Sequence, residues 1–335
     1  MTGRAGYHTI PAVKALVTGG TGFIGSHLIE FLLARPKTSV LALVRDPARL
    51  KWLKGLKVDC VRGDLLTIPP LPSDIDTVFH LAGATKASKS AVYYTVNQKG
   101  TASLFESLAG QGIRARVILL SSLAAAGPLF EGRPVRESDP PRPVSDYGKS
   151  KLAGEREALR FKDRFQLIIL RVGAVYGPRD TDFLRYFKII RRGLLPRYGS
   201  RTPLLSLCHA GDLAEALWIA ARADVETGDV FNIADREPAS WDEIGRAAAR
   251  ALGRRVRPVR VPRFLVYGAA CLADLAGRLS GRPGIFGRDK YREMIQEGWV
   301  QDVGKAEAVL GFRTSIPLER GIQDTIRWYK DQGRL

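Results

Sequence analysis

The sequence contains few cysteines. Only Cys60, Cys208 and Cys271 occur among 335 residues, and they lie far apart along the chain. An odd number of scattered cysteines offers neither a disulfide framework nor the spacing of a metal site. We therefore expect a reducing, cytoplasmic setting and no bound metal.

Long apolar runs are also missing. The longest, at about residues 264–273, ends at Asp274, far short of the roughly 20 residues that a membrane span requires. The tail up to Thr9 has no apolar core of the kind found in signal peptides. We expect no integral membrane segment, and this apolar run leaves peripheral contact with a membrane open.

Acidic residues are a minority, with 34 Asp and Glu against 52 Lys and Arg, so the formal net charge is +18. Such a balance can indicate a nucleic-acid or anionic-membrane partner. The basic residues are spread along the chain, however, and no DNA-binding motif accompanies them. We predict no nucleic-acid partner and interpret the charge as a basic surface, part of which serves an anionic cofactor.

A glycine-rich turn near the start of the chain separates a short apolar strand, residues 13–17, from a helical pattern. Gly19, Gly22 and Gly25 follow one another at spacings of three. Glycine allows a sharp turn and a close backbone approach to a ligand. The free amides and the positive dipole end of the following helix suit a pyrophosphate. This stretch therefore predicts a nucleotide-binding site.

Short apolar segments and helical patterns alternate along the chain, which predicts an α/β fold: a Rossmann-type doubly wound parallel sheet with a smaller C-terminal α/β substrate lobe. We expect strands at residues 13–17, 39–44, 58–61, 76–81, 116–120, 166–172 and 230–233. We assign residues 10–178 to the NAD(P)-binding domain, with later segments such as 204–235 returning to it. Residues 179–335 then form mainly the substrate-binding lobe.

Several local features outside the glycine turn are also predicted. Helices are expected at residues 91–109 and 264–279, and another begins at Ser145 or Asp146 as its N-cap. Loops are expected at residues 193–203 and 281–287, and Asp212 is a candidate N-cap. Three aromatic residues at helical spacing favour core packing, with an apolar substrate pocket as the alternative: Phe183, Tyr186 and Phe187.

Arg45 directly follows the second expected strand. In dinucleotide folds an acidic residue at this point binds the ribose 2′-hydroxyl, whereas an arginine accommodates a 2′-phosphate. The pair Arg45–Asp46 leaves both readings open. Because Arg45 comes first, and Arg49 and Lys51 follow closely, we favour NADP(H) and keep NAD(H) as the alternative.

Tyr147 and Lys151 stand four residues apart, so they share one face of the expected helix. A free tyrosine has a pKa near ~10, too high for ready proton exchange at neutral pH, but a nearby cation lowers it. Ser122, at the end of a neighbouring strand, could bind the same substrate oxygen. We interpret Tyr147 as a general acid/base that acts while hydride is transferred.

In this order, these motifs resemble the extended short-chain dehydrogenases/reductases, the NAD(P)-dependent epimerase/dehydratase family. The resemblance covers roughly the first 180 residues. The matching pieces are the glycine turn from Thr18 to Gly25, Gly63-Asp64-Leu65, His80-Leu81-Ala82-Gly83, Asn97 with Gly100-Thr101, Ser121-Ser122, Tyr147 with Lys151, and Arg171 with Tyr176-Gly177-Pro178.

The resemblance implies a role for each matching position. Tyr147 would be the general acid/base, Lys151 would hold the nicotinamide ribose and tune Tyr147, and Ser122 would orient the substrate oxygen. A homodimer through the helices that contain Asn97 and Tyr147 is also implied. The implied cofactor-binding residues are Gly19, Gly22, Phe23, Ile24, Gly25, Arg45, Asp64, Leu65, Leu81, Ala82, Gly83, Asn97, Tyr147 and Lys151.

Residues 43–47 and 264–279 are similar to the dihydroflavonol reductase and 3β-hydroxysteroid dehydrogenase-like branch of this family. That branch acts on secondary alcohols and ketones of bulky, apolar small molecules, so we expect an NAD(P)-dependent oxidoreductase of this kind. An NAD-dependent nucleotide-sugar epimerase is the alternative. A third reading, a sensor that binds the dinucleotide without turnover, fits less well because Tyr147 and Lys151 are both present.

Overall fold

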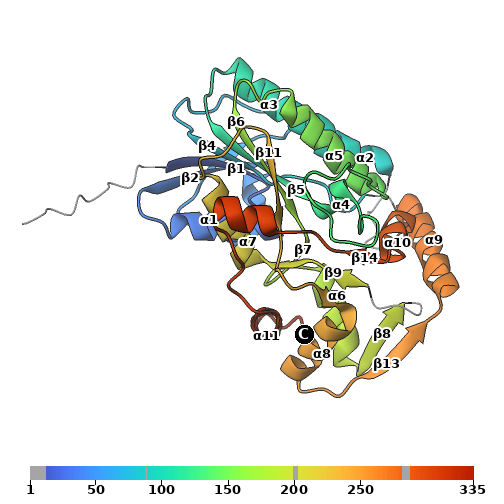
Figure 1. Ribbon diagram of the computed structural model, residues 1–335. Helices are drawn as coiled ribbons and strands as arrows, with labels where there is room; N and C mark the ends of the chain where they lie inside the picture. The colour runs from blue at the N-terminus through green and yellow to red at the C-terminus, as the bar shows by residue number, and fades with distance from the viewer. Residues whose placement is uncertain (1–12, 88, 199–202, 281–286) are drawn as a thin grey trace, which may run out of the picture.

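The computed structural model describes residues 13–87, 89–198, 203–280 and 287–335. The tail up to Thr9 and nearly all of the loop predicted at residues 281–287 lie outside the described residues. The centre of the molecule is a seven-stranded parallel sheet with the order β11-β6-β5-β4-β1-β2-β3 (Figure 1). Its strands are β1 (Val13–Thr18), β2 (Thr38–Val44), β3 (Asp59–Arg62), β4 (Thr77–His80), β5 (Arg116–Ser122), β6 (Gln166–Val172) and β11 (Asp229–Ile233).

The sheet is doubly wound, which confirms the predicted fold class. From β1 the chain first builds outward through β2 and β3, and then returns to place β4, β5, β6 and β11 on the other side of β1. The winding therefore reverses between β1 and β4. In open sheets of this kind a ligand crevice lies at this reversal, outside the carboxyl ends of the strands.

Helices cover both faces of the sheet because each carries one apolar stripe. On one face lie α1 (Phe23–Leu33) and α7 (Ala210–Ala220), and Leu28, Ile29 and Leu32 of α1 are fully buried there. On the other face lie α3 (Gly100–Gly110) and α5 (Asp146–Leu159) (Figure 1). Both faces are thus closed, as the apolar strands between them require.

The helix predicted at residues 91–109 is interrupted. It consists of α2 (Ser90–Tyr94), the π-helical turn η3 (Thr95–Lys99) and α3. Single π-turns of this kind are frequent at functional sites. Apolar periodicity does not show a local change from i→i+4 to i→i+5 hydrogen bonding, so the sequence predicted one uniform helix.

A third hydrophobic core lies between α6 (Asp182–Arg191), α8 (Trp241–Leu252) and α11 (Leu318–Asp331). Phe183, Tyr186 and Phe187 are all buried in it, as the core interpretation predicted.

The domain division at residue 178 stays a prediction. The remaining elements are η1 (Pro47–Arg49), η2 (Lys51–Leu53), α4 (Leu123–Ala126), β7 (Ala174–Tyr176), β8 (Leu194–Tyr198), β9 (Leu204–Leu205), β10 (Leu207–His209), β12 (Ala239–Ser240), β13 (Arg257–Val261), α9 (Arg263–Ser280), α10 (Arg288–Met294), β14 (Gly298–Trp299) and η4 (Ala306–Leu310).

Two local predictions in this half of the chain were wrong. The loop predicted at residues 193–203 contains the strand β8, which pairs in parallel with β13. The N-cap of α7 is His209, whose Nδ1 accepts a hydrogen bond from the Gly211 amide at 3.1 Å. Asp212 instead accepts hydrogen bonds from the amide and hydroxyl of Ser315, each at 3.0 Å. Its partner is a distant segment that local spacing cannot reveal.

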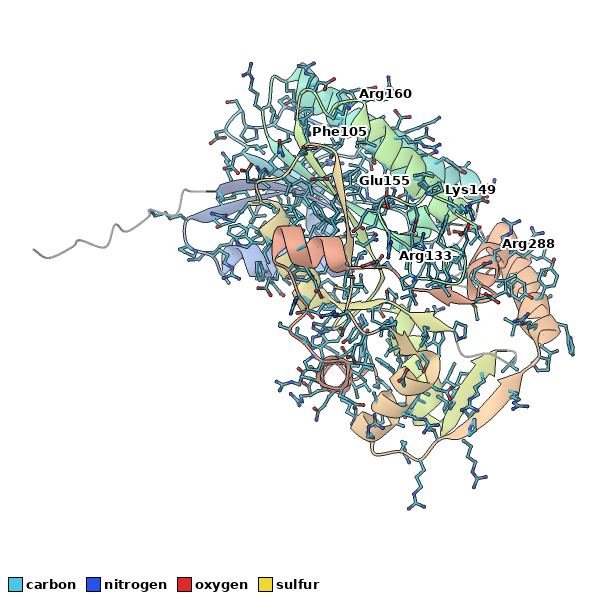
Figure 2. The ribbon with its side chains drawn as sticks, in the orientation of Figure 1. Phe105, Arg133, Lys149, Glu155, Arg160 and Arg288 are labelled. Carbon is cyan, nitrogen blue, oxygen red and sulfur yellow. The ribbon has the colours of Figure 1, made fainter. Side chains whose placement is uncertain are left out.

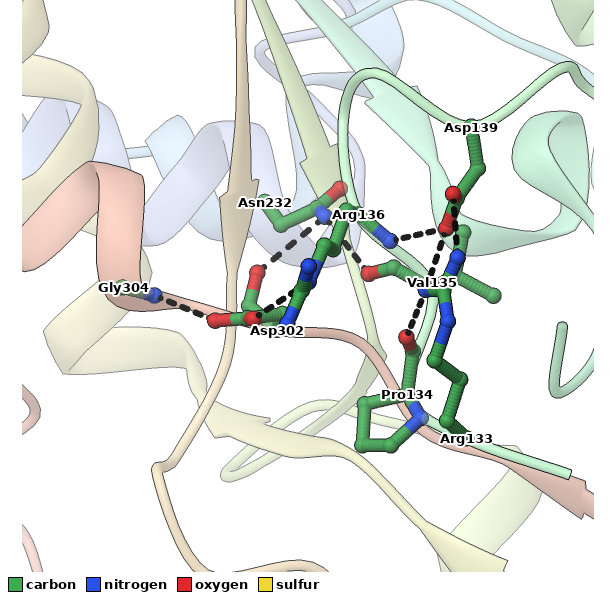
Figure 3. A network of polar contacts seen from close by, with 8 residues as sticks. All are labelled: Arg133, Pro134, Val135, Arg136, Asp139, Asn232, Asp302 and Gly304. Atoms are coloured by element: carbon green, nitrogen blue, oxygen red, sulfur yellow. Dashed lines mark hydrogen bonds and ion pairs between the residues drawn. The ribbon is translucent and has the colours of Figure 1, made fainter.

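A polar network fixes the long loop between α4 and α5 (Figure 3). Buried Asn232 of β11 donates hydrogen bonds to the carbonyl oxygens of Val135, at 3.1 Å, and Asp302, at 3.2 Å. Within the loop, the Arg133 guanidinium binds both carboxylate oxygens of Asp139, at 2.7 and 2.9 Å. The loop is therefore anchored to the sheet before the chain enters α5.

None of the helices that the structure describes is both long enough and apolar enough to cross a membrane.

Candidate active site

A cavity of about 2180 Å³ lies at the carboxyl ends of the central strands, where the winding of the sheet reverses. Its wall includes every predicted site residue except Asn97. These are Gly19, Gly22, Phe23, Ile24, Gly25, Arg45, Asp64, Leu65, Leu81, Ala82, Gly83, Ser122, Tyr147 and Lys151. The fold thus brings together groups that are spread over 133 positions of sequence, from residue 19 to residue 151.

The glycine turn is shaped so that only hydrogen atoms fit at its tightest points. Gly19 has φ +74°, and a Cβ there would lie 2.7 Å from the amide nitrogen of Ala82. A Cβ on Gly25 would lie 2.3 Å from the carbonyl oxygen of Gly19. The N-cap of α1, Gly22, offers no side-chain hydrogen bond, and the first turn holds no acidic residue. The first amides of α1 are therefore free to bind an anion in the cavity.

Arg179, which was not predicted as a site residue from the sequence, lies beside this turn. Its guanidinium donates hydrogen bonds to Ser26, at 3.0 Å, and to Glu30, at 2.6 Å, both on α1. Its Nε is buried without a hydrogen-bond partner among the described residues, and its backbone has φ +77°. A strained cationic residue with an unused donor on the cavity wall suits a diphosphate. The residues present therefore fit a dinucleotide.

Directly after β2, Arg45 lines the cavity, and Lys51, Asp64 and Leu65 line it as well. Arg45 is exposed and forms no ion pair within the described part of the chain. The carboxylate of Asp46 is directed elsewhere: it accepts a hydrogen bond from the Ala48 amide at 3.0 Å and lies 3.3 Å from Arg49. Asp46 is thus occupied in the turn that follows β2.

The three predicted catalytic side chains share one wall of the cavity. Ser122 ends β5, and its hydroxyl lies beside the phenol of Tyr147 on the first turn of α5. The Ser122 oxygen also accepts a hydrogen bond from the Ala124 amide at 3.1 Å, so it caps α4 as well. One turn beyond Tyr147, the Lys151 ammonium donates to the carbonyl oxygen of Leu120 at 2.7 Å.

Burial controls the protonation of both titratable groups. It raises the pKa of the Tyr147 phenol, the neighbouring Ser122 hydroxyl opposes this shift, Glu293 raises the pKa further and Lys290 lowers it. Burial also lowers the pKa of Lys151 to about 8, against the opposing charge of Glu155. The phenol is therefore protonated at neutral pH and can act as a proton donor. The predicted tuning of Tyr147 by Lys151 stays a prediction.

Helix α10 reaches Tyr147 from the other end of the chain. The Asp289 carboxylate accepts hydrogen bonds from the amides of Asp146, at 2.7 Å, and Tyr147, at 3.2 Å. Ser145, the N-cap of α5, donates its hydroxyl to Glu293 at 2.7 Å. The start of α5 is thus fixed by residues about 140 positions away. These residues were not predicted from the sequence because nothing in their local pattern indicates the contact.

Asn97 does not line the cavity, and its predicted contact with the cofactor stays a prediction. It is buried in the π-helical turn, and its side-chain oxygen accepts a hydrogen bond from the Ala84 amide at 2.8 Å. Its side-chain nitrogen donates to the Ala84 carbonyl, at 3.0 Å, and to Ser150, at 2.9 Å. Asn97 therefore holds the loop after β4 against α5 and shapes the cavity from behind.

A buried ion pair connects α5 to the sheet. Arg171 of β6 binds both carboxylate oxygens of Glu155, at 2.7 and 3.0 Å, and Ser121 donates its hydroxyl to the same carboxylate. The two charged side chains are only 5% and 3% exposed. Glu155 lies on the inner face of α5, whereas Lys149 and Arg160 are exposed (Figure 2). The pair fixes the helix that carries Tyr147 and Lys151.

Within the described ranges, no group of His, Cys, Asp and Glu side chains could hold a metal ion.

Comparison with known proteins identifies the family. The model of the NAD dependent epimerase/dehydratase family matches residues 15–234. The ceramide reductase of Caulobacter vibrioides is 33% identical over 329 residues, which cover 95% of each chain. The decarboxylating sterol-4-alpha-carboxylate 3-dehydrogenase of Saccharomyces cerevisiae is 26% identical over 351 residues, covering 96% of this chain and 98% of the relative.

Solved structures agree with these relatives. MoeE5 in complex with UDP-glucose and NAD superposes with a TM-score of 0.75 at 29% identity, over 95% of this chain and 99% of MoeE5. The UDP-glucuronic acid 4-epimerase of Bacillus cereus, bound to UDP-glucuronic acid and NAD, gives 0.76 at 26% identity, over 96% and 100% of the two chains. The chain belongs to the NAD dependent epimerase/dehydratase family, and it is an NAD(P)-dependent oxidoreductase of the extended short-chain dehydrogenase/reductase type.

Proposed function

We propose that this enzyme exchanges hydride between NADP(H) and a secondary alcohol or ketone on a bulky, apolar, lipid-like molecule. The observation that carries the proposal is the placement of Tyr147, Ser122 and Lys151 on the wall of a cavity that also contains the glycine turn. The relatives named for ceramide and for a sterol carboxylate, both matched over nearly their whole length, support a lipid-like substrate.

Each side chain has a distinct task in this proposal. When bound, the nicotinamide cofactor supplies or accepts the hydride. In reduction, Tyr147 donates its proton to the carbonyl oxygen, and the Ser122 hydroxyl orients that oxygen by a hydrogen bond. In oxidation the phenol first loses its proton to solvent, and the resulting phenolate oxygen receives the proton of the alcohol. Lys151, fixed by Leu120, would hold the nicotinamide ribose.

The apolar part of the substrate has a suitable wall. Val92, Phe183 and Trp241 line the cavity, and the rings of Phe183 and Trp241 lie 5.8 Å apart.

Cofactor preference rests on Arg45 and Asp46. Since Asp46 is engaged by Ala48 and Arg49 while Arg45 has no ion pair among the described residues, a 2′-phosphate has a free guanidinium available.

Replacing Arg45 with aspartate is expected to weaken NADPH binding about 100-fold, since a charge-assisted contact is lost and a repulsive charge is added. NADH binding should change less than about threefold, because NADH has no 2′-phosphate. Isothermal titration calorimetry of both cofactors measures this. The matched control is Arg49→Asp, an exposed arginine one turn away that is expected to leave both affinities nearly unchanged. Tighter binding of NADH than of NADPH by the wild type would contradict the preference.

Lys151 sets an alkaline limit on the reaction. Because its pKa is about 8, the ammonium is charged below this pH and becomes neutral as the pH rises through it. Reduction is therefore expected to be flat from about pH 6 to 7.5 and to fall above about pH 8. In Lys151→Arg the guanidinium stays charged, so the alkaline limb should move upward by more than one pH unit, whatever the loss in overall rate. A pH profile of kcat/KM tests this. If the alkaline limb stays at the same pH in Lys151→Arg, the limb arises from the titration of another group.

A further inference from the structure

The outer face of α9 is apolar where a surface helix is normally polar. Phe264 is 72% exposed, Leu265 54%, Leu272 68% and Leu275 55%. The residues at positions 265, 272 and 275 are spaced at seven and three, so they share one side of the helix. Val266 and Ala270 are buried on the opposite side. The helix thus has apolar residues on both sides, and an exposed apolar patch of this kind marks an interaction surface.

A cluster of arginines leads into this helix. Strand β13 and its flanks carry five exposed arginines: Arg254, Arg255, Arg257, Arg260 and Arg263. In the described part of the chain, none of the five pairs with a carboxylate. Strand β13 runs directly into α9 on the side of the molecule that lies away from the central sheet (Figure 1). Positive charge and exposed apolar area therefore occur in consecutive elements.

The inner side of α9 belongs to the cavity. Ala273, Asp274 and Gly277 lie on the cavity wall. The Asp274 carboxylate forms an ion pair with Arg288 of α10 at 2.8 Å, and the rings of Tyr267 and Tyr291 lie 5.2 Å apart. Helix α10 in turn holds the start of α5 beside Tyr147. A molecule in contact with α9 is thus next to the cavity that contains the candidate catalytic residues.

We propose that α9 and the β13 arginines form a docking surface for an anionic lipid bilayer. The exposed leucines and Phe264 would enter the boundary between headgroups and acyl chains, and the guanidinium groups would bind lipid phosphates. The negative charge of the bilayer complements the exposed arginines, which favours a bilayer over a second copy of the chain as the partner of this surface. A second copy would bring the same unpaired arginines together on a protein with a net charge of +18.

The proposal rests on the proposed function in one respect only: a bilayer is where an apolar, lipid-like substrate would be found. Docking itself requires no turnover, so it can be measured separately. The full chain is sedimented with phosphatidylcholine vesicles and with vesicles that contain about 30% phosphatidylglycerol, at low salt and at about 0.5 M NaCl. The variants are Leu265→Glu/Leu272→Glu and Arg257→Glu/Arg260→Glu, all at exposed positions outside the cavity wall.

We expect binding to the anionic vesicles only, lost at high salt, and weakened at least about 30-fold in each double variant. The matched control is Arg114→Glu/Lys162→Glu, which makes the same change in charge as the arginine variant at exposed positions in two other loops and should bind like the wild type. NADPH binding should be unchanged in all variants, which shows that they fold. The proposal would be overturned if the wild type did not bind vesicles, or if the control variant lost as much vesicle binding as the two test variants. It would also be overturned if the wild type were a dimer that Leu265→Glu/Leu272→Glu converts to a monomer. Failure to reduce a ketone dispersed in detergent would count against the proposed function alone.

Discussion

Replacing Tyr147 with phenylalanine is expected to lower kcat about 1,000-fold, because the variant cannot donate the proton that the carbonyl oxygen requires. The ring, which packs 5.9 Å from Tyr93, stays in place. NADPH affinity should therefore remain within about threefold of the wild type, given that only one hydroxyl is removed. Steady-state kinetics at saturating cofactor, together with a fluorescence titration of NADPH, measures both quantities.

Tyr93→Phe is the matched control for this loss, since Tyr93 also lines the cavity and also loses only a hydroxyl. Its hydroxyl lies beside the backbone at Ala87 and its ring packs against that of Tyr147, so it has a structural role. We expect kcat to fall less than about fivefold in this variant. Equal losses in the two variants, or a Tyr147→Phe enzyme with a tenth of the wild-type rate, would contradict the assignment of Tyr147 as the acid.

Replacing Arg171 with methionine is expected to lower the free energy of unfolding by about 3–5 kcal/mol. The variant leaves the Glu155 carboxylate buried at 3% exposure, with the Ser121 hydroxyl as its remaining hydrogen-bond partner among the described residues. The double variant Arg171→Met/Glu155→Leu should recover at least about half of this loss, since neither charge is then buried. Urea unfolding followed by circular dichroism measures all three proteins.

Arg160→Met provides the comparison for an exposed pair. Arg160 is 67% exposed and binds Glu157 at 2.7 Å, and its loss should cost less than about 1 kcal/mol. If Arg171→Met were no more destabilising than Arg160→Met, the Glu155–Arg171 pair would not anchor α5 to the sheet. The positions of Tyr147 and Lys151 would then need another explanation.

Features that depend on neighbours in sequence could be predicted. The tight turn at Gly19 and Gly25 follows from glycine spacing between a strand and a helix, and the structure shows why no larger residue fits there. The shared helix face of Tyr147 and Lys151 follows from their four-residue spacing. Apolar runs located the seven strands to within one or two residues, and their alternation with helices predicted the doubly wound sheet.

Features that depend on distant segments could not be predicted. Asp289 and Glu293 reach the start of α5 from about 140 residues away, through capping hydrogen bonds that leave no periodic pattern. Arg179 was not predicted because it is recognised by its buried Nε, which has no hydrogen-bond partner among the described residues. Only the tertiary structure shows this. The burial of Asn97 depends on the π-helical turn, which apolar spacing does not distinguish from a regular helix.

The most direct test of the account is to follow the hydride. The wild-type enzyme is incubated once with a long-chain ketone in detergent micelles and NADPH that carries deuterium at the transferable position, and once with UDP-glucose and NAD⁺, and the products are analysed by mass spectrometry. We predict a secondary alcohol that contains the deuterium, formed in equal amount with NADP⁺ and almost absent in Tyr147→Phe. Conversion of UDP-glucose to its C4 epimer without net reduction of the cofactor, together with an unreacted ketone, would contradict the account and identify a nucleotide-sugar epimerase.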